Sequence, residues 1–436
     1  MNILIVTPFY KQDKTIGSVR WTNLAMRLAK HHNVIVVTQP LDNNSEEITM
    51  TQEDNLQLIR CNQLSLYEKI ASRYFGGDAG NDWQTKPTAK SLPATNQKIR
   101  ESFLRKIKNR VFYASAEQKA RSYAKWICRN AIPSDLKIDI VISSACPFIE
   151  MLFGYELKKQ LKCRWVCDFR DLPFMIDAND DTHLAKAILF KVLNHADTIT
   201  VVTKGLKRYL QSLFPHLESK ISVLTNGFSL SDQRNKTVIA DNKLHVVYTG
   251  SLYAGSRFDL LFRAVKEIQK EHPFQFFLDF VGGRGSVMAE TARQYGLEES
   301  VRDNGFLPRE KALEFQNSAD CLLLLASENL SALPAKMFEY ILCKKPVVCL
   351  THDPEGKAEV TDVVKDLNLG VAVEEANGAG DFAILKDFLL KQWQRKCNEE
   401  PLEYYPDMEK IKRYDHDNLV ISLEDLMNRL LTSKIE

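Results

Sequence analysis

Lys336 and Glu339 are the two side chains whose types and spacing best suit phosphate and sugar chemistry. They stand in the stretch PAKMFEYILCKKP, which begins with Pro334, a residue that suits the first turn of a helix because its missing N–H costs nothing there. Apolar residues recur in this stretch at helical spacing, and Lys336, Glu339 and Tyr340 share the other face.

A helix of this kind could hold a nucleoside diphosphate. The N–H groups at a helix N-terminus bind anions, and Lys336 adds a cation beside them. Glu339 lies one turn further along, where its carboxylate can accept hydrogen bonds from two sugar hydroxyls. Phosphate at the helix tip and ribose at Glu339 would together fix the ligand. The alternative is a plain strand–helix–strand unit in which Glu339 is solvated.

The segments around this stretch are typical of two buried strands and a loop. Cys321–Leu325 and Val347–Leu350 are continuous apolar runs, short enough for strands that are buried on both faces. Between them, Ala326–Leu333 is a loop of small and polar residues. Its last three residues precede the predicted helix, and we expect their backbone to contribute to the nucleotide site: Ser331, Ala332 and Leu333.

Length and composition limit the classes of protein that this sequence can represent. A chain of 436 residues is too long for one ordinary core and predicts two domains. A hydrophobic fraction of 44%, a charged fraction of 26% and a net charge of +2 are ordinary for a soluble globular protein and indicate no general attraction to nucleic acid. No apolar run reaches the ~18 residues of a membrane helix, and the N-terminus lacks the features of a signal peptide. We therefore expect a cytoplasmic protein.

Neither the cysteines nor the acidic clusters predict a metal site. The nine cysteines stand mostly in apolar segments, and the closest pair, Cys163 and Cys167, fits no zinc spacing. We interpret them as reduced core residues of a cytosolic protein. The run Asp177–Asp181 resembles a metal-binding Asp-x-Asp, but no strand precedes it, and we interpret it as a solvated turn. No metal and no cofactor are expected.

Strands and helices alternate along the first half of the chain, which is typical of a doubly wound parallel sheet. Ligands of such sheets bind at the carboxyl ends of the strands. After the first strand, Asn2–Thr7, Gly17 either lines a cleft or is a turn glycine. After a later strand, Arg164–Phe169, the candidates for contact with a sugar are Arg170 and Asp171. The alternative for this DFRD segment is a structural ion pair.

The second half repeats the alternation. A strand at Leu244–Thr249 leads into a loop that contains Gly250, and a strand at Phe276–Val281 ends in the run GGRG. That run must be weighed as a dinucleotide-binding fingerprint. Met288 stands where the third glycine belongs, and the acidic residue about 20 positions further on, Asp303, is expected to precede a strand rather than to end one. The fingerprint is therefore weak.

These residues together resemble the donor site of GT-B glycosyltransferases, especially the retaining enzymes of family 4. The form PAKMFEY, followed by a proline and a strand, is similar to the branch of that family that builds bacterial surface polysaccharides. The family carries a Glu-x7-Glu motif whose second Glu binds the ribose. Glu339 matches the second Glu, whereas the first position is Ser331.

The resemblance also implies which residues hold the diphosphate. The family has Gly-Arg after the first strand of its second domain, and a Lys five residues further on. Gly250 matches the glycine, but Ser251 and Ser256 replace the two cations. We therefore carry over Gly250, keep Ser251 as a neighbour of the nucleotide, and propose Arg257 and Lys336 as substitute cations.

Four further segments receive roles from the resemblance. Gly282 and Gly283 would approach the base and phosphates with bare backbone, and Leu307 lies in the loop that relatives place against the nucleobase. Gly17 lies in the first loop, which lines the cleft between domains in the family. Arg170 stands nearest the position of a family His that touches the transferred sugar.

The fold implied by the resemblance is α/β, with two facing Rossmann-like doubly wound domains. Residues 1–228 would form the N-terminal, acceptor-side domain, with an irregular insertion at 42–133. Residues 229–243, which are polar and lack an apolar period, would form the linker. Residues 244–412 would bind the nucleotide sugar, and a final helix in residues 413–436 would cross back onto the first domain.

The basic segment Lys98–Tyr113 predicts an amphipathic helix, with apolar residues along one face and lysines and arginines around it. Such a helix can lie on an anionic membrane surface, or it can pack its apolar stripe on its own domain. The resemblance favours peripheral contact with the inner face of the membrane, because many relatives act on lipid-linked acceptors.

The function implied is metal-independent transfer of a sugar from a nucleotide diphosphate to a hydroxyl of a glycan or lipid-linked acceptor, with retention of configuration. A UDP-sugar is the first expectation for the donor and a GDP-sugar the second. One alternative is a nucleotide-sugar 2-epimerase, which shares the two-domain fold and needs no acceptor. Another is a degenerate glycosyltransferase that acts as a non-catalytic binding subunit. The missing first Glu and the missing Arg-Lys pair support this hypothesis.

Overall fold

The computed structural model describes residues 1–11, 17–41, 48–61, 114–145, 149–170, 182–232, 239–252, 256–326, 333–352, 358–374 and 377–433. Several sequence predictions lie outside these residues: those on Asp171, Asp177–Asp181, Ser331, Ala332 and the basic segment Lys98–Tyr113.

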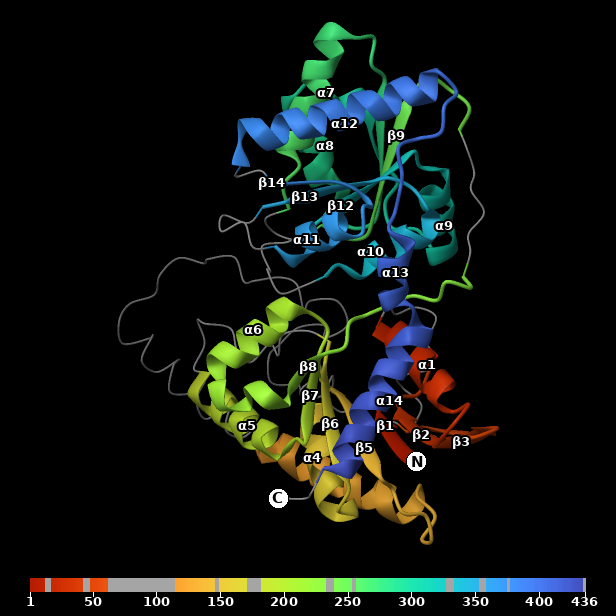
Figure 1. The fold of residues 1–436 in the computed structure, drawn as a ribbon, viewed down its shortest axis with the longest axis vertical. Coiled ribbons are helices and arrows are strands. Elements are labelled where there is room, and N and C mark those ends of the chain that lie inside the picture. The colour runs from red at the N-terminus through yellow and green to blue at the C-terminus, as the bar shows by residue number, and fades with distance from the viewer. Residues whose placement is uncertain are drawn as a thin grey trace. The chain divides into compact units, whose positions relative to one another are not determined.

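The chain divides into two compact units. Unit 1 comprises Met1–Val202, Leu206–Thr225 and Leu419–Glu436, and unit 2 comprises Thr203–Gly205 and Asn226–Asn418. Each unit is built on one sheet with helices on both of its faces (Figure 1). The expected fold class, two doubly wound α/β domains, is confirmed.

Unit 1 contains an eight-stranded sheet whose neighbouring strands are parallel, except for the antiparallel edge pair β3–β4. The central strands are runs of branched apolar residues such as ILIV in β1, buried on both faces as a parallel sheet requires. In sheet order the strands are β3 (Thr49–Glu53), β4 (Leu56–Arg60), β2 (Asn33–Thr38), β1 (Asn2–Val6), β5 (Ile140–Ala145), β6 (Arg164–Phe169), β7 (Thr198–Val201) and β8 (Ile221–Val223).

Helices bury the apolar side chains of this sheet in two separate cores, one on each face. The larger core is covered by a helix over residues 114–130 and by α4 (Ile149–Leu161), α5 (Thr182–His195) and α6 (Lys204–Leu213). The 3-10 helix η3 (Pro215–Lys220) leads into β8. The core on the other face is covered by α1 (Gly17–Leu28) and α14 (His416–Thr432).

The last helix belongs to unit 1 although it follows unit 2 in the sequence. Leu423 and Met427 of α14 are buried in one cluster with Ile3, Ile5 and Trp21. The segment in which one final helix was expected contains the short 3-10 helix η6 (Lys412–Tyr414), then the extended residue Asp415, and then α14. Its apolar stripe therefore completes the core over β1, the first strand of the chain.

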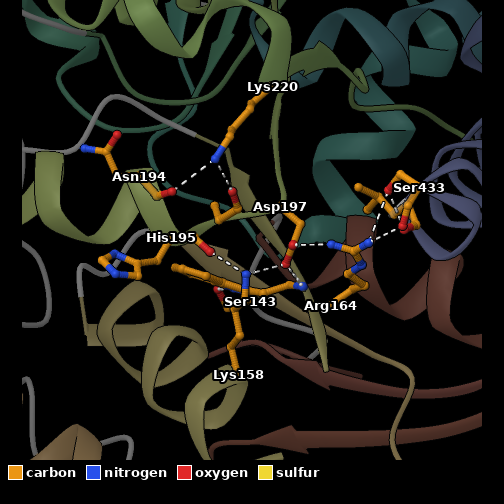
Figure 2. Close-up of polar contacts among 11 residues, drawn as sticks. Ser143, Lys158, Arg164, Asn194, His195, Asp197, Lys220 and Ser433 are labelled. Carbon is orange, nitrogen blue, oxygen red and sulfur yellow. Dashed lines mark hydrogen bonds and ion pairs between the residues drawn. The ribbon is translucent and has the colours of Figure 1, made fainter. Parts of the chain in front are cut away.

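A network of hydrogen bonds and ion pairs lies at the amino ends of β6 and β7 (Figure 2). Asp197 accepts hydrogen bonds from Lys158 Nζ at 2.6 Å, from Arg164 Nη1 at 3.0 Å and from the backbone N–H of Trp165 at 2.8 Å. Arg164 also donates from Nη2 to the carbonyl of Ser433 at 2.5 Å, which satisfies an acceptor at the end of α14. These charges satisfy one another, so this edge of the sheet is structural.

Unit 2 contains a six-stranded sheet that is parallel throughout. Most of its strands are short apolar runs such as CLLLL in β12. In sheet order they are β11 (Val301–Asp303), β10 (Phe276–Val281), β9 (Leu244–Thr249), β12 (Cys321–Leu325), β13 (Val347–Thr351) and β14 (Gly370–Glu374).

Helices also cover both faces of the second sheet. One core contains residues of α7 (Asp259–Glu271), α8 (Gly285–Gln294) and α12 (Ala379–Cys397), and the other contains residues of α9 (Arg309–Ser318), α10 (Ala335–Cys343), α11 (Glu359–Asp366) and α13 (Met408–Ile411). The helix predicted from Pro334 is α10, and Pro334 is its N-cap. The short 3-10 helix η4 (Glu298–Ser300) precedes β11.

Two features are absent from the described residues. None of their helices has both the length and the apolar character needed to cross a membrane. Within the same residues, no three His, Cys, Asp or Glu side chains are grouped so that they could hold a metal ion.

Candidate functional site

Two glycines bring the carboxyl ends of β9 and β10 together with bare backbone. Gly250 has φ +115° and Gly282 has φ +154°, conformations that side chains disfavour. The N–H of Gly250 donates to the carbonyl of Val281 at 2.8 Å. A Cβ on Gly282 would lie 2.0 Å from the carbonyl oxygen of Gly250, so only glycine fits this approach. A ligand at this edge of the sheet would therefore meet main chain.

Lys336 points at this turn from the first helical turn of α10. A Cβ built on Gly250 would lie 3.0 Å from Lys336 Nζ, which shows how closely the cation approaches the end of β9. Nζ also lies 3.9 Å from the centre of the Tyr248 ring. Burial lowers the pKa of Lys336 to about 7, and the nearby Glu339 only partly opposes this effect. A bound anion would supply the partner that restores the positive charge.

Glu339 is held by two side chains of α9. Its Oε1 accepts a hydrogen bond from Arg309 Nη2 at 2.9 Å, and its Oε2 accepts one from Gln316 Nε2 at 3.3 Å. Gln316 Nε2 also donates to Thr249 Oγ1, at the end of β9, at 2.8 Å. The Glu339 side chain is 20% exposed. The carboxylate is thus oriented by its neighbours while one side of it stays accessible to a ligand.

Tyr340 anchors α10 rather than facing solvent. The helical spacing predicts the polar face of the helix for Tyr340, and this prediction is wrong, because the side chain is fully buried. Its hydroxyl donates to the carbonyl of Leu323 at 3.2 Å and accepts from the N–H of Thr249 at 3.3 Å. This bridge ties α10 to β9 and β12, and it fixes where Lys336 and Glu339 stand.

The remaining predicted site residues of unit 2 differ in burial and in the element that carries them. Ser251 is exposed, and its Oγ would lie 3.1 Å from a Cβ on Gly283, so these two predicted residues are neighbours. Leu333 is buried just before α10, Leu307 is partly buried in the loop before α9, and Arg257 is exposed shortly before α7. The structure therefore gathers Gly250, Ser251, Gly282, Gly283, Lys336 and Glu339 at the ends of β9 and β10.

Asp303 stands where a dinucleotide-binding fingerprint at the GGRG run would have its acidic residue. The expectation that it precedes a strand is wrong, because it is the last residue of β11, a three-residue edge strand with too little apolar character to predict. A Cβ on Gly285 would lie 2.3 Å from its Oδ1. The fingerprint therefore departs from the pattern at its third glycine, which is Met288, while Asp303 ends the next strand and lies against the first residue of α8.

In unit 1 the structure joins two candidates from separate motifs. Arg170 follows β6, and its Nη1 donates to the carbonyl of Gly17 at 2.8 Å. Its guanidinium also lies 5.8 Å from the centre of the Phe9 ring. A Cβ on Gly17 would lie 2.7 Å from Nη1, so the absence of a side chain at Gly17 makes room for the arginine.

The DFRD segment does contain a structural ion pair, but its partner is Arg20. Asp168 is fully buried, and its Oδ1 lies 2.8 Å from Arg20 Nη2. Trp21 Nε1 and Thr200 Oγ1 also donate to this carboxylate, at 3.0 and 2.7 Å. No local pattern in the sequence indicates Arg20 as this partner, because only the tertiary fold places α1 against the end of β6.

The fold of this chain is the GT-B fold of glycosyltransferases. Sucrose-phosphate synthase from Thermosynechococcus elongatus matches with a TM-score of 0.60 and 13% identity, over 99% of this chain and 100% of its own. The trehalose-phosphate synthase (UDP-forming) from Burkholderia vietnamiensis matches with 0.58 and 10%, over 98% and 100%. The lipopolysaccharide outer core galactosyltransferase WaaB matches with 0.55 and 15%, over 98% and 99%.

Sequence comparison locates the family signal in the second half of the chain. Residues 231–398 match the family model described as glycosyl transferases group 1. A search of curated proteins finds no significant match. Residues 231–398 of unit 2 are thus similar to group 1 glycosyltransferases, and together with the fold this indicates a glycosyltransferase.

Proposed function

We propose that this protein transfers a sugar from a nucleoside diphosphate to a hydroxyl of a glycan or lipid-linked acceptor, with retention of configuration. The observation that carries the proposal is the position of Lys336 Nζ against the bare turn at Gly250, with the Glu339 carboxylate one helical turn further along α10. A cation at a glycine turn suits a diphosphate, and an accessible carboxylate beside it suits a ribose.

Each group would have a defined part in the reaction. Lys336 and the backbone N–H groups at the start of α10 would stabilise the diphosphate as negative charge develops on it. Glu339, held by Arg309 and Gln316, would accept hydrogen bonds from the ribose hydroxyls. Arg257 is proposed as a second cation. Because protein cations would supply the counter-charge, we propose that no metal is needed.

The donor and the pathway are proposed from the fold relatives. One of these is described as UDP-forming, which supports a UDP-sugar as the first candidate and a GDP-sugar as the second. Another is described as a lipopolysaccharide galactosyltransferase, which supports a role in bacterial surface polysaccharide synthesis. Such a role would place the protein in the cytoplasm, in peripheral contact with the inner face of the membrane.

The ribose site is tested by measuring nucleotide affinity after two changes, made separately and together: the Glu339→Ala substitution, and removal of the ribose hydroxyls from the ligand. We expect this variant to bind UDP about 10–150-fold more weakly, the range for charged hydrogen bonds worth ~1.5–3 kcal/mol. It should bind 2′,3′-dideoxy-UDP as the wild type does, because that ligand lacks the hydroxyls. Glu314→Ala on α9, whose carboxylate pairs with Lys311 at the surface, is the matched control. Equal losses for both ligands would refute the assignment.

Two assays separate the proposed transferase from its alternatives. The first assay measures thermal shifts with UDP, GDP, ADP, dTDP, CMP and NAD, each with and without EDTA, and identifies the base of the donor and any dependence on metal. A ligand at about 100 times its Kd raises the free energy of unfolding by ~2.7 kcal/mol, which is enough to detect. Incubation of the cognate nucleotide sugar without acceptor tests the 2-epimerase, which would produce a second nucleotide sugar. A protein that binds nucleotide and neither transfers nor epimerises would be the non-catalytic binding subunit. The anomeric proton coupling of the product reports retention.

A further inference from the structure

A pocket of unit 1 has no part in the reaction proposed above. Its volume is about 420 Å³, and its walls come from β7, β8, α6 and α14. All of its lining residues belong to unit 1. Figure 1 shows β8 between α6 and α14, whose apolar side chains lie in the two separate cores of the unit 1 sheet. Among the described strands β8 ends the sheet, so the pocket lies at a sheet edge.

The sheet contributes hydroxyl groups to this pocket. Thr200 of β7 and Ser222 of β8 are partners in the parallel register, and both line the pocket. Leu224 follows Ser222 by two residues and is buried in the core that α14 covers, which places Ser222 on the same face of the sheet. Thr200 Oγ1 donates its hydrogen to Asp168 at 2.7 Å. Ser222 Oγ makes no hydrogen bond with any described residue, so it can donate one to a ligand.

The two helices each contribute one cation. Ser422, Leu426 and Arg429 of α14 are four and three residues apart, a spacing that aligns them on one side of the helix, and all three line the pocket. Lys207 of α6, which is partly buried, lines the pocket from the other helix. Two cations from elements far apart in the sequence are therefore brought to one pocket by the tertiary fold.

The charge of these two side chains is not balanced within the pocket. No described residue forms an ion pair or a side-chain hydrogen bond with Lys207 or Arg429, and none of the residues that line the pocket is acidic. The cations at the amino ends of β6 and β7 differ, since Lys158 and Arg164 there share the carboxylate of Asp197. Two like charges in one pocket repel each other, and an anion between them would replace this repulsion by two attractions.

The donors of the pocket suit a phosphate group, because an ammonium, a guanidinium and a hydroxyl all donate hydrogen bonds to phosphate oxygens. A pocket of about 420 Å³ is also large enough to hold more than a bare phosphate ion. We propose that it binds a phosphate ester. The phosphate lies between Lys207, Arg429 and Ser222, and the organic part packs on Leu423 and Leu426, which also line the pocket. This ligand binds in addition to the donor nucleotide, whose proposed residues lie in unit 2.

The test uses the full chain and glycerol 3-phosphate, with glycerol as the probe that lacks the phosphate. Saturation-transfer NMR titrations give the Kd. We expect the wild type to bind glycerol 3-phosphate and not glycerol. Lys207→Gln and Arg429→Gln should each weaken binding at least about tenfold, because each removes a charged hydrogen-bond donor. Arg208→Gln is the matched control, since Arg208 is an exposed cation of α6 that does not line the pocket, and it should leave the Kd unchanged.

Two further variants show whether the ligand occupies this pocket. Ser422→Trp, at an exposed position of α14 that lines the pocket, keeps both cations and fills the space between them, so it should abolish binding. Wild-type affinity in Ser422→Trp would mean that only the general positive charge of the surface attracts the probe, and it would overturn the proposal. Lys336→Met should bind glycerol 3-phosphate as the wild type does, whereas a loss of binding would move the phosphate to the donor site and overturn the pocket.

A second arm identifies the source of the phosphate, which is either a soluble ester or the headgroup of a lipid. Co-sedimentation is measured with vesicles of phosphatidylcholine, with and without phosphatidylglycerol. Binding that requires phosphatidylglycerol and is lost in the double variant of Lys207→Gln and Arg429→Gln would assign the pocket to a lipid headgroup. Binding of glycerol 3-phosphate without such vesicle binding would assign it to a soluble ester.

The outcomes are separable from those of the nucleotide test. The proposal is overturned if the wild type binds neither glycerol 3-phosphate nor the anionic vesicles, or if the double variant binds them as the wild type does. The double variant should keep the UDP affinity of the wild type within about twofold, because the nucleotide residues lie in unit 2. Failure of UDP to bind the wild type would refute the proposed function and leave the phosphate pocket standing.

Discussion

Donor binding should be coupled to uptake of a proton by Lys336. The pKa of its ammonium group is about 7 because of burial, and a bound diphosphate would raise it toward its ordinary value of 10.5. At about one pH unit above the lowered pKa, only about a tenth of the free protein carries the charge, so binding should take up about 0.9 proton. At about one unit below, uptake should fall to about 0.1 proton.

The same linkage fixes the pH dependence of affinity. Above the lowered pKa, the proton must be taken from solution before the ion pair can form, so the dissociation constant rises. Between about pH 6.5 and about pH 8.5, the Kd should rise about 25-fold. UDP-glucose is a suitable probe, because its diphosphate is a diester and does not titrate in this range.

The assay is isothermal titration calorimetry in two buffers with different heats of ionisation, which counts the protons directly. Lys336→Met should bind more weakly and take up none. Lys336→Arg, which is always charged, should bind with little pH dependence. If the wild type binds the nucleotide sugar at about pH 8 without taking up a proton, then Lys336 is not the partner of the diphosphate and the site is wrongly assigned.

Three further perturbations test the structure. Without ligand, Lys336→Met should raise the free energy of unfolding most below about pH 7 and hardly at all near pH 10.5. The reason is that folding lowers the pKa of Lys336, which costs stability at every pH where the lysine is charged in the unfolded chain. Urea titration at several pH values measures this free energy. Asp168→Ala should lower the free energy of unfolding by ~3–5 kcal/mol, since it leaves the buried Arg20 uncompensated; a mild effect in chemical denaturation would contradict the buried pair. In a thermal-shift titration, Gly282→Ala should reduce UDP affinity at least about tenfold, because the new side chain forces the ends of the two strands apart. The control is Gly378→Ala, at a positive φ with open space around it, which should leave UDP affinity unchanged.

Local patterns in the sequence predict the class of fold and place Lys336 and Glu339 on one helix. Short apolar runs alternating with amphipathic stretches define buried parallel strands and their crossover helices, and this signal is local. The placement of Lys336 and Glu339 in successive turns of one helix was also readable, because helical periodicity fixes which residues share a face. α10 begins after Pro334, as that pattern predicts.

Contacts between groups on different elements depend on the tertiary packing. β9 and β12 are neighbours in the sheet although some 70 residues separate them, and this adjacency brings Lys336 to the turn after β9 in place of a cation from that loop. The bonds of Arg309 and Gln316 to Glu339 and the burial of Tyr340 depend on the same packing. No local pattern encodes such contacts, because they follow from strand order and helix docking, which are set by the whole core.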